Sequence, residues 1–422
     1  MKKKRILLLA YMISPYRGSE YSVAWNHVLY LSKFYAIDVV YGCSGDHMGD
    51  NDDLEHYLVE NKLENVSFIF VKPSKLASIL NVFNKKNILR SSFYLAYHVW
   101  HKDAYAHVRL LPNLSQYDFV HYLNPIGYRE PGFLWRLPLP YIWGPIGGTI
   151  SIRTAVQPSL PIKAKLQFCM RNIMNYYQLY FSKRISQALT STDIVLTATT
   201  ENKRCIRQSK GILSLHLPEN GPVGVFVEDR RYYYKNKLNL IWVGTLEYRK
   251  NLQLLLDVID RCEKSAEISV IIVGNGPLYD FYRDNISKNG KYSCISMLGG
   301  VTRTEVADIF NKSDLHVITS MSEGNPTTLW EALASGVPTI SLDINGMKDT
   351  INTTNGFLIS HNAPYETIVE EFAQKIDQLC IDHDIIPKMK EGIRDTFDKN
   401  HWRHRERRWQ EIYDLLENVG LD

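Results

Sequence analysis

Short apolar runs alternate with helical patterns along most of the chain. Runs of this length are typical of buried strands, and regular alternation with helices predicts parallel sheets covered on both faces. The predicted fold class is therefore α/β, with two Rossmann-like, doubly wound domains. The first series of predicted strands is Ile6–Ala10, Ile37–Tyr41, Val66–Val71, Phe119–His121, Tyr141–Trp143 and Ile194–Thr197, and the second is Leu238–Val243, Ser269–Val273, Ser293–Leu298, Leu315–Thr319, Thr339–Ser341 and Gly356–Ile359.

A cluster of turn residues, Pro218–Pro222, separates the two series. We therefore predict an N-terminal domain over residues 1–217 and a C-terminal domain over residues 218–400. A last helix is predicted within residues 401–422, because apolar side chains recur at helical spacing from Trp402 to Leu416.

Composition agrees with a soluble enzyme of two domains. A chain of 422 residues is too long for a single core, and 45% hydrophobic with 22% charged residues is ordinary for globular proteins. The six cysteines are scattered without a C-x-x-C pair. This spacing fits a reducing cytosol and argues against a disulfide framework or a zinc site.

The N-terminus resembles a secretion signal only superficially. Lys2–Arg5 precede the apolar run Ile6–Ile13, but the run is short and is followed by Pro15 and Arg17 without a small-residue cleavage site. A first buried strand is the better interpretation. Prolines and glycines interrupt the longest uncharged run, Leu137–Ile152, so no membrane span is expected. We expect a cytoplasmic protein, peripheral on the inner face of the cell membrane.

Charge is divided unevenly between the two halves. Residues 1–217 hold 26 Lys and Arg against 14 Asp and Glu, a net of +12, whereas residues 218–422 hold 23 against 31, a net of −8. No acid occurs between Glu64 and Asp103 or between Glu130 and Asp193. This basic half is either a solvated face or a surface that attracts an anionic acceptor or an anionic membrane.

The segment Leu166–Phe181 also has two interpretations. Its apolar residues follow helical spacing, which is most often the pattern of a helix that faces a core. The alternative is an aromatic and basic surface that meets lipid headgroups or a lipid-linked acceptor. The residues concerned are Cys169, Met170, Ile173, Tyr177 and Tyr180.

The most informative polar pattern places two carboxylates, Glu323 and Glu331, on either side of a turn and a helix start. Pro326 suits the first turn of a helix, and apolar residues recur at helical spacing from Leu329 onward. The free N–H groups of residues 324–328 and the positive end of the helix dipole would then face one ligand. A helix N-terminus flanked by two carboxylates suits a nucleotide sugar, which carries both phosphates and hydroxyls.

Four glycine-bearing turns follow predicted strands, where open parallel sheets bind their ligands. None has the P-loop sequence, and the G-x-G-x-x-G pattern is absent at the first turn of either half. Arg249 and Lys250 come shortly after the strand-end Gly244, where they would reach a pyrophosphate held by the 324–328 amides. A plain surface pair is the alternative. The turns are Ser14–Glu20, Trp143–Gly148, Val243–Asn251 and Val273–Pro277.

These motifs together carry a resemblance to a known family. The chain resembles a GT-B glycosyltransferase of glycosyltransferase family 4, the large retaining family, over nearly its whole length. The most specific motif is the E-x7-E element from Glu323 to Glu331 with its ending Gly336-Val337-Pro338. The others are Val243-Gly244, Arg249-Lys250-Asn251, Gly274-Asn275-Gly276-Pro277, Leu298-Gly299, Pro15 to Glu20, Asn220-Gly221 and Gly356-Phe357-Leu358.

The resemblance implies two domains that face a central cleft, with the C-terminal helix crossing back to the N-terminal domain. Residues 218–400 would bind the donor, a nucleoside diphosphate sugar, and residues 1–217 would form the acceptor side. The donor is a substrate, so no cofactor is expected.

The resemblance also implies roles for single residues. Glu331 would hold the ribose hydroxyls, and Glu323 with the amides of Gly324 to Thr327 would hold the donor sugar. Arg249 and Lys250 would neutralise the departing diphosphate. Gly18 would approach the phosphates, and Leu298 and Gly299 would lie near the base. The catalytic set is Glu323, Arg249 and Lys250, and the donor-binding set is Gly18, Ser19, Gly244, Leu298, Gly299, Gly324, Asn325, Pro326, Thr327, Thr328 and Glu331.

The chain departs from the family pattern at three places. Thr245 follows the strand glycine, where many relatives have an arginine. The turn after Trp143 has no histidine, and His121 is the nearest alternative, although a satisfied strand-end histidine is the simpler interpretation. Met347 follows Gly346 where some relatives carry a carboxylate.

No metal site is expected. The single D-x-D sequence, Asp382-His383-Asp384, lies far from the motifs and is interpreted as surface charge. Cationic side chains and a helix end can stabilise a leaving diphosphate without a metal.

The first functional hypothesis is a metal-independent, retaining transferase of the hexosyl type. It would move a sugar from a nucleoside diphosphate sugar to a glycan or lipid-linked glycan acceptor in surface polysaccharide biosynthesis, without a nucleic-acid partner. The second is a non-catalytic sugar-nucleotide-binding or assembly subunit of the same fold. The third is a sugar-nucleotide epimerase, which needs no acceptor.

Overall fold

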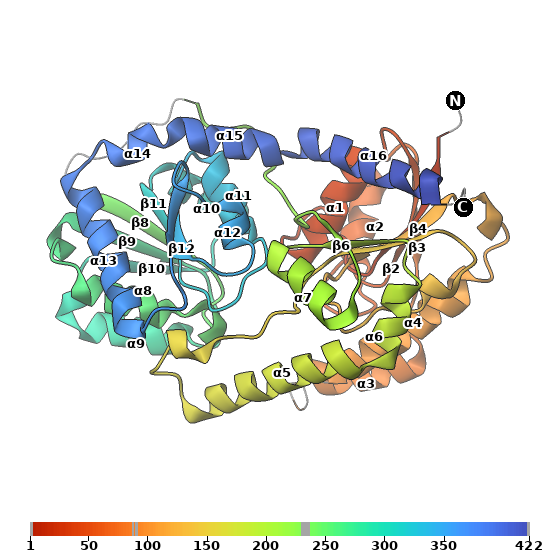
Figure 1. Ribbon diagram of the computed structural model, residues 1–422, viewed down its shortest axis with the longest axis horizontal. Helices are drawn as coiled ribbons and strands as arrows, with labels where there is room; N and C mark the ends of the chain where they lie inside the picture. The colour runs from red at the N-terminus through yellow and green to blue at the C-terminus, as the bar shows by residue number, and fades with distance from the viewer. Residues whose placement is uncertain (1–2, 87, 89–91, 229–236, 420–422) are drawn as a thin grey trace. The chain divides into compact units, whose positions relative to one another are not determined.

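The computed structural model of the chain describes residues 3–86, 88, 92–228 and 237–419 (Figure 1). The chain divides into two compact units. Unit 1 comprises Met1–Thr149, Tyr176–Asn220 and Arg405–Asp422, and unit 2 comprises Ile150–Asn175 and Gly221–His404.

Unit 1 is built on a seven-stranded sheet in the order β3-β2-β1-β4-β5-β6-β7 (Figure 1). Every pairing is parallel, and Leu7 of β1, for example, lies opposite Asp38 of β2 and Val120 of β4. The five inner strands are almost entirely buried, as expected for a parallel sheet covered on both faces, whereas the edge strands β3 and β7 are partly exposed. Their bounds are β1 Arg5–Ala10, β2 Ala36–Tyr41, β3 Val66–Phe70, β4 Phe119–Asn124, β5 Tyr141–Ile146, β6 Ile194–Thr197 and β7 Leu215–His216.

Three helices of unit 1 begin where a hydroxyl side chain caps them. The hydroxyls of Ser74, Ser182 and Thr199 accept hydrogen bonds from the backbone at the starts of α3, α6 and α7. The bounds are α1 Glu20–Leu31, α2 Asp52–Glu60, α3 Lys75–Lys85, α4 Ser92–Val108, α6 Lys183–Thr190 and α7 Thr200–Lys210, with short 3-10 helices at Leu114–Gln116 and Leu134–Arg136. Helix α5, Ile162–Phe181, has residues in both units.

The last helix, α16 (Trp402–Val419), joins unit 1 from residue 405 onward. Its Tyr413 hydroxyl lies 2.8 Å from Nε2 of His27 and 2.9 Å from Nδ1 of His121, and all three side chains are buried. Trp409 packs on the same two imidazole rings. The predicted return of the C-terminal helix to the N-terminal domain is confirmed.

Unit 2 is built on a six-stranded sheet in the order β10-β9-β8-β11-β12-β13 (Figure 1). These pairings are also all parallel. In unit 1 the first three strands extend from β1 in one direction and the later strands extend from β4, beside β1, in the other; β8 and β11 divide the sheet of unit 2 in the same way. Both sheets are therefore doubly wound, as predicted. The bounds are β8 Leu238–Val243, β9 Ile268–Val273, β10 Ile295–Gly299, β11 Leu315–Ile318, β12 Thr339–Leu342 and β13 Gly356–Ile359.

Helices cover the sheet of unit 2, whose buried apolar residues form one large core and smaller separate clusters, one of which is Ile241, Phe310, Ala332 and Val337. A capping box starts α10, where Thr302 and Glu305 bond each other's backbone N–H groups. The bounds are α8 Leu252–Arg261, α9 Tyr279–Lys288, α10 Arg303–Asn311, α11 Thr327–Ala334, α12 Met347–Thr350, α13 Tyr365–Ile381, α14 Ile385–Lys388 and α15 Lys390–Asn400, with 3-10 helices at Thr154–Val156, Tyr248–Lys250, Ser265–Glu267 and Gly290–Tyr292.

Residues 150–175 pack with unit 2, whereas the predicted boundary leaves them in the N-terminal domain. Ile152, Val156 and Leu160 join the core of unit 2. The side-chain amide of Asn251 donates a hydrogen bond to the carbonyl of Val156 at 2.9 Å. The local apolar pattern identifies these residues as buried but does not say in which core.

Helix α5 corrects one expectation. Its residues Cys169, Met170, Ile173, Tyr177 and Tyr180 are all exposed, so the interpretation of this side as core-facing is wrong. The residues of α5 that are buried are instead Ala164, Asn175 and Leu179. The spacing predicted the helix and its apolar stripe, but it did not show whether the stripe faces the core or the solvent.

Among the described residues, no helix combines the length and apolar character that crossing a bilayer requires. The six cysteines are all free.

Candidate functional site

Two of the predicted glycine turns, Val243–Asn251 and Val273–Pro277, meet each other and Gly299 at the carboxyl ends of neighbouring strands in unit 2. The N–H of Gly244, after β8, donates to the carbonyl of Val273 at 3.0 Å, and the N–H of Gly274 donates to the carbonyl of Gly299 at 2.7 Å. Gly274 has φ +133°, and a Cβ there would lie 2.0 Å from the carbonyl oxygen of Gly244. Only glycine allows this approach of two strand ends, so the turns form one continuous edge.

The predicted helix start after Glu323 is present as α11. Pro326 precedes its first residue, Thr327, with an extended backbone, and Glu331 stands on the second turn as expected. A Cβ on Gly346 would lie 2.1 Å from the carbonyl oxygen of Gly324. The turn that leads into α11 therefore rests directly on the backbone after β12, which holds the first N–H groups of the helix in place.

Arg249 lies in the short 3-10 helix Tyr248–Lys250 that follows β8, between two carboxylates. Its Nη2 is 2.7 Å from Oε1 of Glu247, and its Nη1 is 3.1 Å from Oε1 of Glu323 and 2.8 Å from the carbonyl of Ser322. Burial opposes the charge, but the two carboxylates raise the pKa of Arg249 above its usual value. The guanidinium is thus fixed as a cation at this edge.

Lys250 contacts the same oxygen of Glu323, with Nζ 2.5 Å from Oε1. The Glu323 side chain is 9% exposed and that of Lys250 is 15% exposed. Burial alone raises the pKa of Glu323, but Lys250 and Arg249 lower it below its usual value, so the carboxylate is ionised at neutral pH. The three predicted catalytic side chains therefore form one cluster of two cations around one anion.

Thr319, directly after β11, ties the loop that carries Glu323 to the segment that carries the two cations. Its hydroxyl donates to the carbonyl of Lys250 at 2.9 Å and accepts from the indole N–H of Trp242 at 3.0 Å. The N–H of Met321 also donates to the carbonyl of Arg249 at 2.8 Å. Two loops far apart in sequence are thereby held in fixed register.

Sequence reasoning missed both Thr319 and Glu247. Glu247 stands in the same turn as Arg249, two residues earlier, and an acid so close to a cation was the available signal. Thr319 carried no signal, because a threonine at a strand end is common and its two partners are distant in sequence.

Glu331 contacts a different cation from those that contact Glu323. Its side chain is 32% exposed, and its nearest described cation is Arg303 of α10, with Nη2 3.9 Å from Oε1. Burial raises the pKa of Glu331, and Arg303 offsets this in part. A carboxylate without a close charged partner is available to accept hydrogen bonds from ligand hydroxyls.

The remaining predicted donor residues of unit 2 lie along the same edge. The position of a Cβ on Gly244 would be 3.5 Å from the side-chain carbons of Lys250. Leu298, the last residue but one of strand β10, is 48% exposed although it is apolar, and Gly299 follows it with φ +72°. Thr245, which replaces the family arginine, is exposed, and Met347 after Gly346 is buried.

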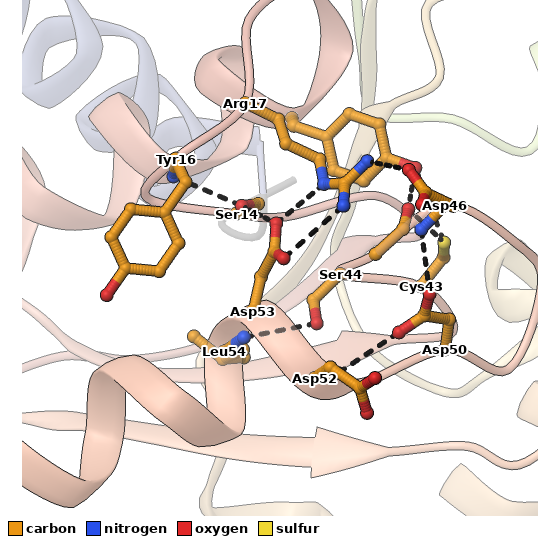
Figure 2. Close-up of polar contacts among 12 residues, drawn as sticks. Ser14, Tyr16, Arg17, Cys43, Ser44, Asp46, Asp50, Asp52, Asp53 and Leu54 are labelled. Carbon is orange, nitrogen blue, oxygen red and sulfur yellow. Dashed lines mark hydrogen bonds and ion pairs between the residues drawn. The ribbon is translucent and has the colours of Figure 1, made fainter.

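Gly18 and Ser19 lie in the loop between β1 and α1 of unit 1. Figure 2 shows the Arg17 guanidinium between the carboxylates of Asp53 and Asp46, with Nε 2.6 Å from Oδ2 of Asp53. The Ser14 hydroxyl donates to the same oxygen of Asp53 at 2.7 Å. The loop is thus anchored on both sides of Tyr16.

Beyond this anchor the backbone is strained. Ser19 has φ 54° and ψ −135°, a region that favours glycine, and its side chain does not cap α1. A Cβ on Gly18 would meet nothing within 4 Å, so the backbone there is open to approach.

His121 is a satisfied core histidine. Its Nε2 lies 2.8 Å from the carbonyl oxygen of Gly144, which must accept, so this nitrogen carries the proton. Its Nδ1 then accepts from Tyr413. Burial lowers the pKa of His121 to about 4, despite the opposing effect of the Gly144 carbonyl. Both ring nitrogens are occupied, as the simpler interpretation expects.

Within the described ranges, no group of three or more His, Cys, Asp or Glu side chains is arranged to hold a metal ion. The structure brings together Glu323, Arg249, Lys250 and Gly244 in unit 2. The residues Gly18 and Ser19 belong to unit 1.

Comparisons with known proteins agree with this architecture. Residues 229–395 match the family model of Glycosyl transferases group 1. The chain is 28% identical over 229 residues to the UDP-N-acetylglucosamine–peptide N-acetylglucosaminyltransferase GtfA subunit of Streptococcus agalactiae, which covers 52% of this chain and 44% of that protein. The chain thus spans about half the length of the curated relatives it matches.

Solved structures match over nearly the whole chain. The lipopolysaccharide outer core galactosyltransferase WaaB, in its apo form, superposes with a TM-score of 0.64 at 18% identity, covering 97% of this chain and 99% of that one. Anabaena Alr3699/HepE in complex with UDP and glucose superposes with a TM-score of 0.59 at 13% identity, covering 98% and 100%. The chain therefore has the two-domain α/β fold of GT-B glycosyltransferases, and its residues 229–395 match the glycosyl transferases group 1 model.

Proposed function

We propose that the chain is a retaining glycosyltransferase that takes a sugar from a nucleoside diphosphate donor. The observation that carries the proposal is the cluster of Arg249, Lys250 and Glu323 beside the start of α11. Two partly buried cations, a helix N-terminus and a carboxylate are the groups that a diphospho-sugar needs. The match to the glycosyl transferases group 1 model over residues 229–395 supports this assignment.

In the proposed reaction the bond from the anomeric carbon to the diphosphate oxygen breaks, and its electron pair leaves with the diphosphate. Arg249 and Lys250 stabilise that charge without a metal, because both are cations fixed in place before the donor binds. The acceptor oxygen bonds to the anomeric carbon from the same face, and its proton passes to the leaving phosphate. Glu323 positions the two cations and accepts from the donor sugar.

The remaining donor contacts follow the same edge. Glu331 holds the ribose hydroxyls, the amides of Gly324 to Thr328 hold the donor, and Leu298 with Gly299 lies near the base. A uridine base is supported by two relatives: GtfA is named for UDP-N-acetylglucosamine, and HepE was solved with UDP and glucose. The acceptor is a glycan or a lipid-linked glycan on the side of the N-terminal residues 1–217, whose net charge is +12.

A screen of donors followed by transfer assays tests the proposal. UDP-glucose, UDP-N-acetylglucosamine and GDP-mannose are compared by thermal shift, since a bound donor at about 100-fold excess over its Kd adds roughly 2.7 kcal/mol of stability. With the donor that binds, Lys250→Ala should lower kcat about a hundredfold or more, whereas Lys312→Ala, an exposed lysine of the same unit, should not. Unchanged turnover in both Lys250→Ala and Glu323→Gln contradicts the site.

A second candidate is a non-catalytic sugar-nucleotide-binding or assembly subunit. It is favoured by one observation, that the GtfA relative is named as a subunit. Donor binding without nucleotide release, with the chain alone and with every acceptor tried, would favour this candidate over the first.

A further inference from the structure

Helix α3 of unit 1 has its amphipathic pattern turned outward. Leu76, Ile79 and Phe83 stand at positions i, i+3 and i+7 and share one side of the helix. Their exposed fractions are 57%, 59% and 43%, and Val82 beside them is 42% exposed. A surface helix of a soluble protein normally hides this stripe against the core.

The side of α3 that faces the protein is the more polar one. Ala77 and Asn81 are its buried residues, and the Asn84 side chain donates to the Asn81 carbonyl oxygen at 3.2 Å. The helix is held in this orientation by α4, against which it packs (Figure 1), and by the Ser74 cap. The outward apolar stripe is thus a fixed feature of the fold and not a frayed end.

The charge around the stripe is mainly positive, although the Asp103 carboxylate of α4 accepts a hydrogen bond from the Ser74 N–H at the start of α3. No acid occurs in the sequence between Glu64 and Asp103, and the described lysines on and beside α3 are all exposed. Lys75 and Lys86 fall on the same side of the helix as Ile79 by the 100° rotation per residue. The lysines concerned are Lys72, Lys75, Lys85 and Lys86.

The residue types on the outer face of α3 distinguish between a protein partner and a lipid membrane. Lysine is depleted at interfaces between proteins, where tyrosine, tryptophan and arginine supply most of the binding energy. Leucine and phenylalanine on one side of a helix, with lysines around them, are the pattern of a helix that lies in a membrane interface. Exposed apolar residues continue after the helix at Ile88, Tyr94 and Leu95.

We propose that the outer face of α3 inserts into the surface of an anionic lipid bilayer. Its apolar side chains enter the boundary between headgroups and acyl chains, and its lysines contact lipid phosphates. The inference does not depend on the proposed transferase activity, because lipid binding requires neither donor nor acceptor. It would place unit 1 at a membrane whatever reaction the chain performs.

Vesicle flotation with the full chain tests the proposal. Vesicles of phosphatidylcholine alone are compared with equimolar phosphatidylcholine and phosphatidylglycerol. The wild type should float with the anionic vesicles and less with the neutral ones, and salt should weaken the binding. The double variant Ile79→Ser/Phe83→Ser should lower the partition coefficient about tenfold or more, and each of Lys75→Glu and Lys86→Glu should lower it about fivefold or more.

Val59→Ser is the matched control, because Val59 on α2 is 84% exposed and lies in the same unit. It should bind like the wild type. All five substituted positions are exposed or flank the helix, and thermal unfolding checks that the variants fold. Equal flotation of the wild type and Ile79→Ser/Phe83→Ser overturns the proposal. So does a wild-type dimer, seen by light scattering, that this double variant dissociates while neither protein binds vesicles.

Discussion

Lys250 and Glu323 form the closest ion pair of the candidate site, with Nζ 2.5 Å from Oε1, and Arg249 contacts the same carboxylate oxygen. Arg249 also contacts Glu247, so the cluster holds two cations and two carboxylates. A bound phosphate group would compete with these carboxylates for the two cations. Because these groups are largely buried, their electrostatic interactions are stronger than they would be in water.

Acid should destabilise the wild type through Glu323. The folded-state pKa of this carboxyl is lowered, so its contribution to stability is present above the unfolded pKa of about 4.3 and is lost as the pH falls through the folded value. Glu323→Gln should therefore show a shallower fall in unfolding free energy below that pH, as measured by urea denaturation. Glu391→Gln, on the exposed surface of α15, is the control. Parallel curves for Glu323→Gln and the wild type would contradict the assignment.

Thr319→Val should loosen the register of the two loops. The substitution keeps the shape but leaves the buried indole N–H of Trp242 without its acceptor, at a cost of about 2 kcal/mol in unfolding free energy. Because the same hydroxyl holds the Lys250 carbonyl, kcat for transfer should also fall. Thr190→Val, whose hydroxyl bonds only carbonyls of its own helix, should change neither. Full activity in Thr319→Val would show that the hydroxyl does not position Lys250.

Tyr413→Phe should weaken the attachment of α16 to unit 1. The Tyr413 hydroxyl donates to Nδ1 of His121 and accepts from Nε2 of His27, since Nε2 of His121 must donate to the Gly144 carbonyl. Loss of the hydroxyl leaves two buried nitrogens without this partner and should cost about 2 kcal/mol or more of unfolding free energy. The loss is measured by urea denaturation at neutral pH. An unchanged midpoint would mean that the aromatic contacts alone hold the helix.

Ser19→Gly should stabilise the protein. Ser19 is held at φ 54° and ψ −135°, a conformation that costs a non-glycine residue of the order of 1–3 kcal/mol. Glycine removes this strain and adds entropy to the unfolded chain, so a net gain of about 1 kcal/mol is expected. Ser32→Gly, where φ is −59°, relieves no strain and should be destabilising. Thermal unfolding of the two variants separates these outcomes, and a loss in both would rule out strain at Ser19.

The sequence alone predicted most of the secondary structure and the parts of the site that lie close together in the chain. Ile194–Thr197, Leu238–Val243 and Gly356–Ile359 are strands with the bounds predicted for them. Strand and helix periods are local properties, and so is the turn with Pro326 before α11. The missed strand β7, Leu215–His216, is too short to show a period.

Tertiary structure alone decided which groups meet and which surfaces stay uncovered. Thr319 bonds Lys250 and Trp242 across two strands, residues 150–175 join the core of unit 2, and the apolar stripes of α3 and α5 face outward. A sequence period states that one side of a helix is apolar, but the free energy of burial depends on what packs against that side. That choice is made by contacts between distant segments, which no local pattern contains.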